Sequence, residues 1–307
     1  MKVVMYHYVQ ESAFNLKHFP FLHSAAFKKQ LDFFRCHGGL ITKREWHNFL
    51  ELGDTSAVTG KFLLTFDDGL RCHYEIVRTI LDDLDAIGIF FVCGAPLCKS
   101  EILDVHKLHL LMGLFTPDEL ILRLRSYSPG IEPWDHKNSY DPYSSQTANG
   151  QAGRLKSYFN WSTDPQRHGL LDAVFSDTFG YDFPVSRFYM TAEEIKELSS
   201  NGYVIGAHGM NHRVLANLCK EKQATEIVES LEIVKSVTRR PHVPYAIAHG
   251  LESSYNAHTL DVLRAQHTLA NFVVKSDDVG PSTDLLQIPR YNANEFPHGR
   301  VAYESAA

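Results

Sequence analysis

A short, mostly apolar run that ends in two adjacent carboxylates most constrains the fold of this chain. Residues 62–66 read Phe-Leu-Leu-Thr-Phe, and Asp67, Asp68 and Gly69 follow directly. A run this apolar is typical of a strand buried on both faces, as in a parallel sheet. Glycine then lets the chain turn. In folds built on parallel strands, functional groups lie just past the carboxyl ends, so the run predicts a functional edge at the Asp pair.

Two neighbouring carboxylates are unfavourable at such an edge, because like charges raise each other's pKa. A bound cation would relieve that effect. One aspartate could then ligate the metal while the other stays free as a base. The alternative for an isolated Asp-Asp-Gly is an ordinary acidic turn.

A second polar group follows another short strand far downstream. Residues 203–208 form an apolar run that ends in His208, and His212 comes four residues later. On a turn that opens into a helix, this spacing points both imidazoles to one side. One Asp and two His form a plausible zinc shell with open positions for water and substrate. A surface loop is the alternative for the two histidines alone, but polar groups after two strands favour a metal site.

These two segments resemble the first two motifs of the polysaccharide deacetylases (NodB-homology domain). The first is Thr-Phe-Asp-Asp-Gly at 65–69, and the second is His-Gly-Met-Asn-His at 208–212. The resemblance implies a distorted (β/α) barrel and a metal-dependent hydrolase acting on carbon–nitrogen bonds, with Asp67 as catalytic base. It also implies a divalent cation, Zn²⁺ first, with Co²⁺ or Ni²⁺ as alternatives. The implied metal ligands are Asp68, His208 and His212.

The resemblance extends to both ends of the chain. Residues 3–9 resemble the Tyr-His strand of the circularly permuted branch, which implies that His7 is the general acid. Val-Pro-Tyr at 243–245 resembles the third motif, which implies that the backbone N–H of Tyr245 stabilises the oxyanion. His249 is an alternative acid. Arg290 would orient Asp67 or bind an anionic group of the substrate; an ordinary surface arginine is the alternative.

The second motif departs from the usual family pattern at two positions. Gly209 stands where Ser or Thr is usual, and Arg213 stands where Pro is usual. The departures leave the expected metal ligands in place and bear instead on the residues around them.

Composition fits one enzyme domain spanning 1–307. The chain has 307 residues, of which 44% are hydrophobic, and a formal net charge of −6. This is enough apolar material for one α/β barrel core. The absence of a long basic run argues against a nucleic-acid partner, although a nucleotide-linked sugar needs only a few local donors.

The first residues and the cysteines predict the compartment. Only Lys2 precedes the first apolar run, and no small-residue cleavage site follows, so a secretory signal is not expected. The longest apolar stretch, 87–98, is too short to span a bilayer. Five scattered cysteines do not suggest a disulfide framework. We therefore expect a cytoplasmic protein, which favours a precursor substrate.

Strand and helix patterns alternate along much of the chain, which predicts parallel strands joined by right-handed helical crossovers. Ser24 is expected to cap a helix, and Thr42 and Thr191 begin capping boxes. The expected strands are 3–9, 62–66, 87–93, 203–208, 243–247, 270–274 and 285–288, and the expected helices include 71–86 and 221–237.

The alternation breaks between residues 100 and 186. Thr116 and Pro117 predict a helix start, whereas 126–151 is rich in turn-forming residues and contains Trp134, Tyr140 and Tyr143. We interpret 100–186 as a partly helical insertion. It could serve as a lid or a sugar-binding wall; the alternative is a peripheral elaboration or an oligomer contact.

The expected function is hydrolysis of the N-acetyl group of an acetamido sugar in bacterial surface polysaccharide biosynthesis (O-antigen, capsule or exopolysaccharide). The sugar could be free, nucleotide-linked, lipid-linked or polymeric. One alternative is a catalytically silent carbohydrate-binding module on the same fold, which would need neither Asp67 nor His7. The other is a metal amidohydrolase that acts on a formamide or a cyclic amide.

Overall fold

The computed structural model describes residues 1–13, 15–52, 55–131 and 150–301, and it is built around a closed barrel of parallel strands. Strand β1 pairs with both β4 and β9, which closes the barrel. The prediction of an α/β barrel is therefore confirmed. In barrel order, the strands in the described part of the chain are β1 (Lys2–Tyr6), β4 (Phe62–Phe66), β5 (Gly88–Val92), β6 (Val204–Ala207), β7 (Tyr245–Ala246), β8 (Asn271–Val274) and β9 (Ile288–Asn292).

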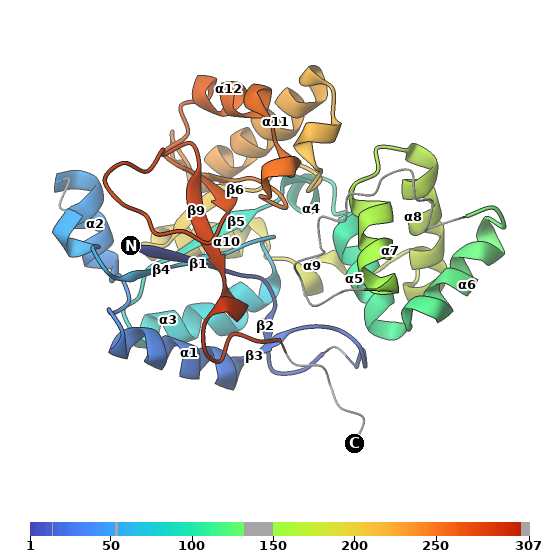
Figure 1. The fold of residues 1–307 in the computed structure, drawn as a ribbon, viewed down its shortest axis with the longest axis horizontal. Coiled ribbons are helices and arrows are strands. Elements are labelled where there is room, and N and C mark those ends of the chain that lie inside the picture. Colours follow the sequence, from blue (N-terminus) through green and yellow to red (C-terminus); the bar gives the residue numbers. More distant parts are fainter. Residues whose placement is uncertain (14, 53–54, 132–149, 302–307) are drawn as a thin grey trace.

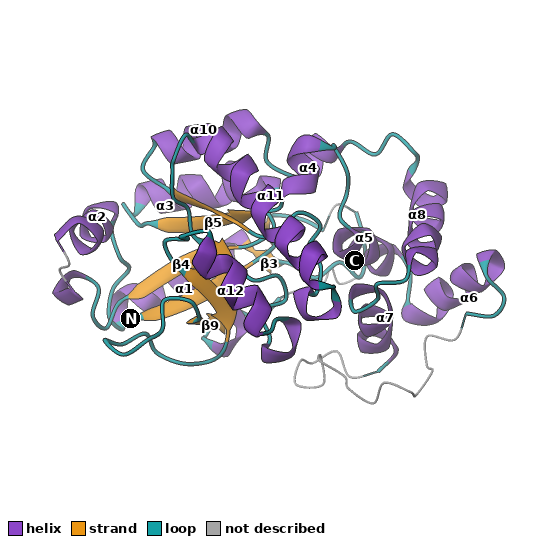
Figure 2. Ribbon diagram, turned by 90° about the horizontal axis from the view of Figure 1, so that it is seen from above, coloured by secondary structure: helices purple, strands orange, loops and turns teal. Residues whose placement is uncertain are grey.

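Helices cover the outside of the barrel, as Figures 1 and 2 show. Their apolar faces pack on the strands. Phe27, Leu31 and Phe34 of α1 are completely buried, and the Phe34 ring stacks on Phe62 of β4 with 4.1 Å between ring centroids. The barrel helices are α1 (Ser24–Cys36), α2 (Lys43–Leu52), α3 (Arg78–Asp83), α10 (Ala192–Ser200), α11 (Lys220–Thr238) and α12 (Ala257–Ala265).

The crossover from β5 to β6 contains the predicted insertion. After α4 (Gly94–Cys98), four helices pack together beside the barrel: α5 (Asp104–Leu114), α6 (Pro117–Tyr127), α7 (Gln151–Asn160) and α8 (Pro165–Phe179). We call these four helices the helical lobe; they stand at the right in Figure 1. The short helix α9 (Val185–Phe188) leads back to the barrel. Trp134, Tyr140 and Tyr143 lie outside the described residues.

The helical lobe has its own apolar core, which extends to the carboxyl edge of the barrel. Leu108, Leu120 and Leu171 are completely buried in this core. The same cluster includes Leu70, just past β4, and Cys93, just past β5. The lobe is therefore packed against the carboxyl ends of these two strands. Among the described helices, none is both long and apolar enough to cross a membrane.

The capping boxes form as predicted. The Glu45 amide donates to Thr42 Oγ1 at 3.1 Å, and the Thr42 amide donates to Glu45 Oε2 at 3.0 Å. Thr191 and Glu194 make the same reciprocal pair at the start of α10. Such boxes need only residues three positions apart, so the local sequence suffices to predict them.

The N-cap of α1 differs from the prediction. Ser24 is already helical, and its hydroxyl donates to the Glu11 carboxylate. His23 has the extended backbone of a cap, and its Nδ1 accepts the Ala25 amide at 3.1 Å. A histidine nitrogen thus replaces the expected serine oxygen as acceptor.

Three other element boundaries differ from the predictions. The first barrel strand ends at Tyr6, and the chain then forms a small sheet of β2 (Val9–Gln10) and β3 (Leu22–His23). The helix expected over 71–86 is divided into a π-helical turn, His73–Val77, and the helix α3. The last strand begins rather than ends at Ile288, because β9 pairs with β8 and β1 beyond that point.

Candidate active site

The Asp pair and the His208 loop meet at the carboxyl edge of the barrel, because β4 and β6 are both parallel neighbours of β5. Asp68 and Gly69 have positive φ angles of 77° and 68° and turn the chain sharply after β4. A Cβ atom on Gly69 would lie 3.0 Å from Val92 Cγ1. Glycine is thus required both for its conformation and for its close approach to β5.

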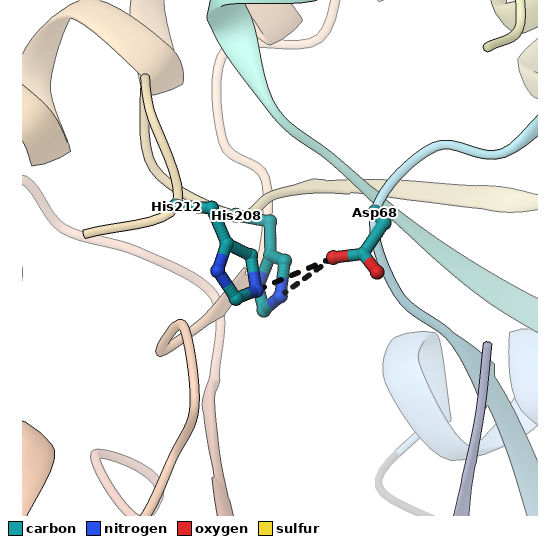
Figure 3. Close-up of side chains that lie close together, drawn as sticks. All are labelled: Asp68, His208 and His212. Carbon is teal, nitrogen blue, oxygen red and sulfur yellow. Dashed lines mark ion pairs between the residues drawn. The ribbon is translucent and has the colours of Figure 1, made fainter. Parts of the chain in front are cut away.

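Three side chains converge as expected for a metal site, and Figure 3 shows their arrangement. Asp68 Oδ1 lies 3.5 Å from His208 Nε2 and 3.3 Å from His212 Nε2. All three residues are buried, and Asp68 Oδ1 has no hydrogen-bond partner. A buried carboxylate oxygen without a partner is unfavourable. A cation between the three groups would satisfy it, so the residues present fit a divalent metal.

The hydrogen bond of one histidine and the burial of the other also suit a metal. His208 Nδ1 lies 2.8 Å from the Ala246 carbonyl, to which it must donate. The Nε2 lone pair of a neutral His208 is then free and faces Asp68. Burial, followed by the neighbouring His249, holds the pKa of His212 well below its usual range. His212 is therefore available as a neutral ligand, and an O,N,N donor set suits several divalent metals.

The loop that carries these histidines is not the start of a helix, which corrects the geometry expected from their spacing. Gly209 and His212 have positive φ angles of 80° and 54°. Glu226 of α11 anchors the loop by accepting the Asn211 backbone amide at 2.9 Å and its side-chain amide at 2.5 Å. A tight loop, rather than a helix face, brings the two imidazoles together.

Asp67 is held by Arg290 from the far end of the chain. Nη1 and Nη2 of Arg290 donate to Oδ1 and Oδ2 of Asp67 at 2.7 and 2.9 Å, and both residues are buried. The surface alternative for Arg290 is thus wrong, and the contact with Asp67 is present. Burial alone would raise the pKa of Asp67, but Arg290 and then His208 outweigh it and lower that pKa. Asp67 is therefore ionised and can accept a proton.

We predict that Arg290→Met lowers the free energy of unfolding by about 3–5 kcal/mol, because it leaves the Asp67 charge buried without its partner. The effect depends on pH with a definite sign. Since the pKa of Asp67 is lowered in the folded state, the ion pair stabilises the protein above the unfolded value of about 3.9. That stabilisation is lost as the pH falls through the lowered pKa that Asp67 has in the folded protein. Urea unfolding at several pH values measures both effects.

Arg264→Met is the matched control for this prediction. Arg264 also pairs with an aspartate, Asp261, at 2.7 Å, but both side chains are more than half exposed. Exposed pairs contribute about 0–1 kcal/mol. Equal losses of stability in the two variants would contradict a special role for the buried pair.

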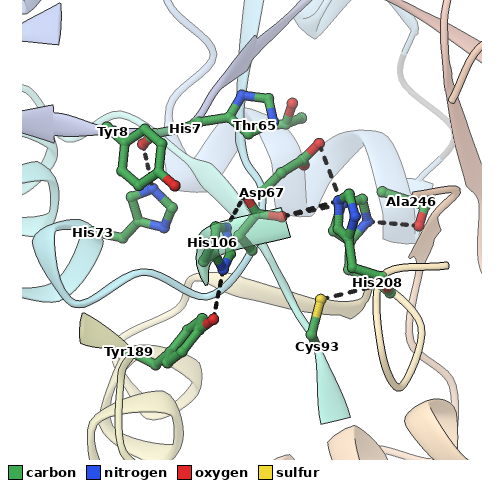
Figure 4. A network of polar contacts seen from close by, with 12 residues as sticks. His7, Tyr8, Thr65, Asp67, His73, Cys93, His106, Tyr189, His208 and Ala246 are labelled. Carbon is green, nitrogen blue, oxygen red and sulfur yellow. Dashed lines mark hydrogen bonds and ion pairs between the residues drawn. The ribbon is translucent and has the colours of Figure 1, made fainter. Parts of the chain in front are cut away.

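His7 follows β1 at the position adjacent to Asp67. Tyr6 is in register with Phe66, and the Asp67 amide donates to the Tyr6 carbonyl at 3.0 Å. His7 is half-buried, and its carbonyl accepts a hydrogen bond from His73 Nε2 at 2.7 Å (Figure 4). The π-helical turn places His73 for this contact. The position is compatible with a general acid, and that role remains a prediction.

His249 also lies at the site, with its ring centroid 4.6 Å from that of His212. Burial, followed by His208, lowers the pKa of His249 to about 4. A group with this pKa carries no proton to donate near neutral pH. This lowered pKa argues against His249 as the acid.

The structure does not support the role predicted for Tyr245. Its backbone N–H donates to the Ala270 carbonyl at 2.9 Å, as part of the pairing between β7 and β8. Binding an oxyanion there would require this barrel hydrogen bond to break. The reason for the difference is the neighbouring strand β8, which takes up the donor.

His106 and Tyr189 were not among the predicted site residues, although both contact the site. His106 of α5 is completely buried, and its Nε2 lies 3.0 Å from Asp68 Oδ2. Its Nδ1 lies 2.5 Å from the Tyr189 hydroxyl (Figure 4). Burial alone would raise the pKa of Asp68, but His106 and then His212 outweigh it and hold that pKa well below the usual range. The helical segment 104–114 contains two histidines, His106 and His109, and nothing local distinguishes the one that reaches Asp68.

Comparison with known proteins gives one family match and several similar folds. A family model described as polysaccharide deacetylase matches residues 173–270, which contain His208, His212 and Tyr245 but not the Asp pair. No protein with a curated description matches the sequence.

Several solved structures have a similar fold. One is the Streptococcus pyogenes deacetylase PplD in complex with acetate, with a TM-score of 0.56 and 14% identity over 95% of this chain and 91% of that one. IcaB from Ammonifex degensii has a TM-score of 0.54 and 18% identity, over 94% of this chain and 89% of that one. A de-N-acetylase from Aggregatibacter actinomycetemcomitans has a TM-score of 0.53 and 11% identity, over 94% of this chain and 93% of that one. These matches confirm the predicted fold.

Proposed function

We propose that this chain, whose residues 173–270 match a polysaccharide deacetylase model and whose fold is similar to that of a deacetylase, is a metal-dependent deacetylase. Its substrate in this proposal is the N-acetyl group of an acetamido sugar used in bacterial surface polysaccharide biosynthesis. One observation carries the proposal: the unpaired Asp68 Oδ1 faces two imidazoles, directly beside a second carboxylate held by arginine.

The chemistry follows from the division of the two aspartates. A divalent cation held by Asp68, His208 and His212 would polarise the substrate carbonyl and acidify a water molecule. Asp67 is ionised, and its bond to Arg290 keeps it directed at the site, so it can take the proton from the attacking water. His7, beside Asp67, then gives a proton to the departing amine.

The proposed general acid favours an N-acetyl over an O-acetyl substrate. When an amide is cleaved, its amine is a very poor leaving group unless it is protonated. The alkoxide of an ester leaves more readily. A de-N-acetylase is also among the proteins with a similar fold. Zinc as the metal, a cytoplasmic location and the relation to the circularly permuted branch all remain predictions.

Metal loading followed by product analysis tests the proposal. The purified protein is loaded with Zn²⁺, Co²⁺ or Ni²⁺, its metal content is measured, and acetate is quantified after incubation with N-acetylglucosamine oligomers and a nucleotide-linked acetamido sugar. About one metal per chain and metal-dependent acetate release would support the proposal.

Other products would support the alternative functions. Turnover of a formamide or a cyclic amide without acetate release would indicate an amidohydrolase. Sugar binding without metal or turnover would indicate the silent binding module. Failure to bind metal under every loading condition would exclude the proposed mechanism.

We predict that His7→Gln lowers kcat on an N-acetyl sugar by about 10²–10⁴-fold, the usual contribution of a general acid. The same variant should lose much less kcat on an aryl acetate, because the leaving group of that substrate needs no proton. Steady-state kinetics on both substrates gives the comparison. His47→Gln, which changes an exposed histidine of α2, is the control. Equal losses on both substrates, or a selective loss only in His249→Gln, would assign the proton to another group.

A further inference from the structure

The helical lobe reaches the metal site through one buried contact. His106 Nε2 lies 3.0 Å from Asp68 Oδ2, while Oδ1 of the same carboxylate faces His208 and His212. We infer that His106 is a positioning residue that fixes which oxygen of Asp68 binds the metal. This inference rests on the metal-dependent function proposed above.

The hydrogen bonds around His106 run in one direction. The Leu103 amide donates to the Tyr189 hydroxyl oxygen at 3.1 Å, which leaves the Tyr189 proton to donate to His106 Nδ1 at 2.5 Å. His106 then carries its own proton on Nε2 and donates it to Asp68 Oδ2. We assign this tautomer because each group has one donor and one acceptor role in the chain. A continuous chain of this kind holds both the imidazole ring and the carboxylate in one orientation.

Each aspartate has a partner suited to its role. Asp67 is bound by the cation Arg290, which keeps it ionised for proton transfer. A cation on Asp68 would compete with the metal for the same negative charge. An imidazole N–H donor orients the carboxylate and leaves its other oxygen for the metal, as the outer-sphere partners of metal ligands do. The pairing therefore distinguishes two carboxylates that are adjacent in sequence.

The insertion is joined to the site at its two ends. Leu103 precedes α5, and Tyr189 follows α9, so the Tyr189 hydroxyl ties the start of the insertion to its end. Tyr189 also pairs with Leu70, next to the Asp-Asp-Gly turn.

A second contact links α5 to the other metal-binding segment. Asp104 Oδ2 lies 3.0 Å from Arg213 Nη1, and Arg213 directly follows His212. The N-terminal turn of α5 thus contacts the segments of both Asp68 and His212, which supports a positioning role for the lobe.

Metal affinity of His106 variants tests the inference. His106→Phe keeps a ring but removes the donor, and His106→Gln restores a donor near the position of Nε2. Competition with a chromophoric chelator gives the Zn²⁺ and Co²⁺ dissociation constants, and the visible spectrum of the Co²⁺ form reports its coordination. We expect about 10- to 100-fold weaker metal binding and an altered Co²⁺ spectrum in His106→Phe, with substantial recovery in His106→Gln.

His109→Phe is the matched control, since His109 lies on the same helix and bonds a tyrosine, Tyr8, but not Asp68. It should bind metal like the parent. A His106→Phe protein that is folded and binds metal with the parent affinity overturns the inference. A lower melting temperature of the metal-free protein with unchanged affinity also overturns it, because that pattern indicates a purely structural histidine.

Tyr189→Phe decides the case if His106→Phe does not fold. It keeps the ring and removes only the hydroxyl that orients His106, so we expect metal binding several-fold weaker than in the parent; parent affinity would overturn the inference. Failure of the parent to bind metal would instead refute the proposed function, so the two failures are distinguishable.

Discussion

Asp68→Asn is expected to weaken metal binding by more than about 100-fold, because even outer-sphere partners of a ligand contribute about 10- to 100-fold. The substitution keeps the size of the side chain and its ability to accept the His106 hydrogen bond, but it removes the negative charge. Asp68 Oδ1 is the carboxylate oxygen that faces both imidazoles, whereas the neighbouring Asp67 is bonded to Arg290 through both of its oxygens. Elemental analysis and chelator competition measure the loss.

Asp85→Asn is a matched control for this variant. Asp85 also has a positive φ angle, 48°, but it is exposed and lies on the turn after α3. It should bind metal as the parent does. His212→Ala should behave like Asp68→Asn, because it removes another of the three converging ligands. Parent-like metal content in Asp68→Asn would refute the assignment of the ligands.

Asp67→Asn is expected to lower kcat by about 10²–10⁴-fold while metal binding persists. The amide cannot take a proton from the attacking water, but it is not one of the three converging ligands. Its oxygen can still accept one hydrogen bond from Arg290, but the buried Arg290 charge loses its counter-ion, so the variant should also be less stable than the parent. Acetate release measured beside metal content separates this defect from that of Asp68→Asn.

The comparison between these neighbouring variants is the informative result. Loss of turnover with metal retained assigns Asp67 to proton transfer, and loss of both assigns Asp68 to the metal. Activity of Asp67→Asn within a few-fold of the parent would mean that another group accepts the proton, since a missing general base has a large effect. Circular dichroism and a melting temperature for each variant exclude unfolding as the cause.

The unequal surroundings of the two aspartates explain how adjacent like charges coexist. The sequence predicts that the pair is unfavourable and that a cation would relieve it. The structure adds a second form of relief. The charge of Asp67 is balanced by the ion pair with Arg290. Asp68 receives a hydrogen bond from His106 on one oxygen, which leaves the other oxygen for the metal. The pKa of each carboxyl is lowered by different neighbours.

Local sequence was sufficient for the elements that depend on neighbouring residues. The apolar runs predicted parallel strands, and the Asp pair and His208 were expected at strand ends because parallel strands share one functional edge. The capping boxes at Thr42 and Thr191 also formed. These features need only a few consecutive residues. The boundary errors at Ser24 and Ile288 arose where pairing or an unexpected acceptor decided the outcome.

The partners of the site residues depended on the tertiary structure. Arg290 reaches Asp67 only because β9 closes the barrel against β1, which brings together residues 223 positions apart. His106 reaches Asp68 only because the helical lobe packs on the carboxyl end of β4. The Tyr245 amide is taken by β8 for the same kind of reason. The sequence alone determined which residues could carry chemistry, whereas packing of distant segments decided which hydrogen bond each of them makes.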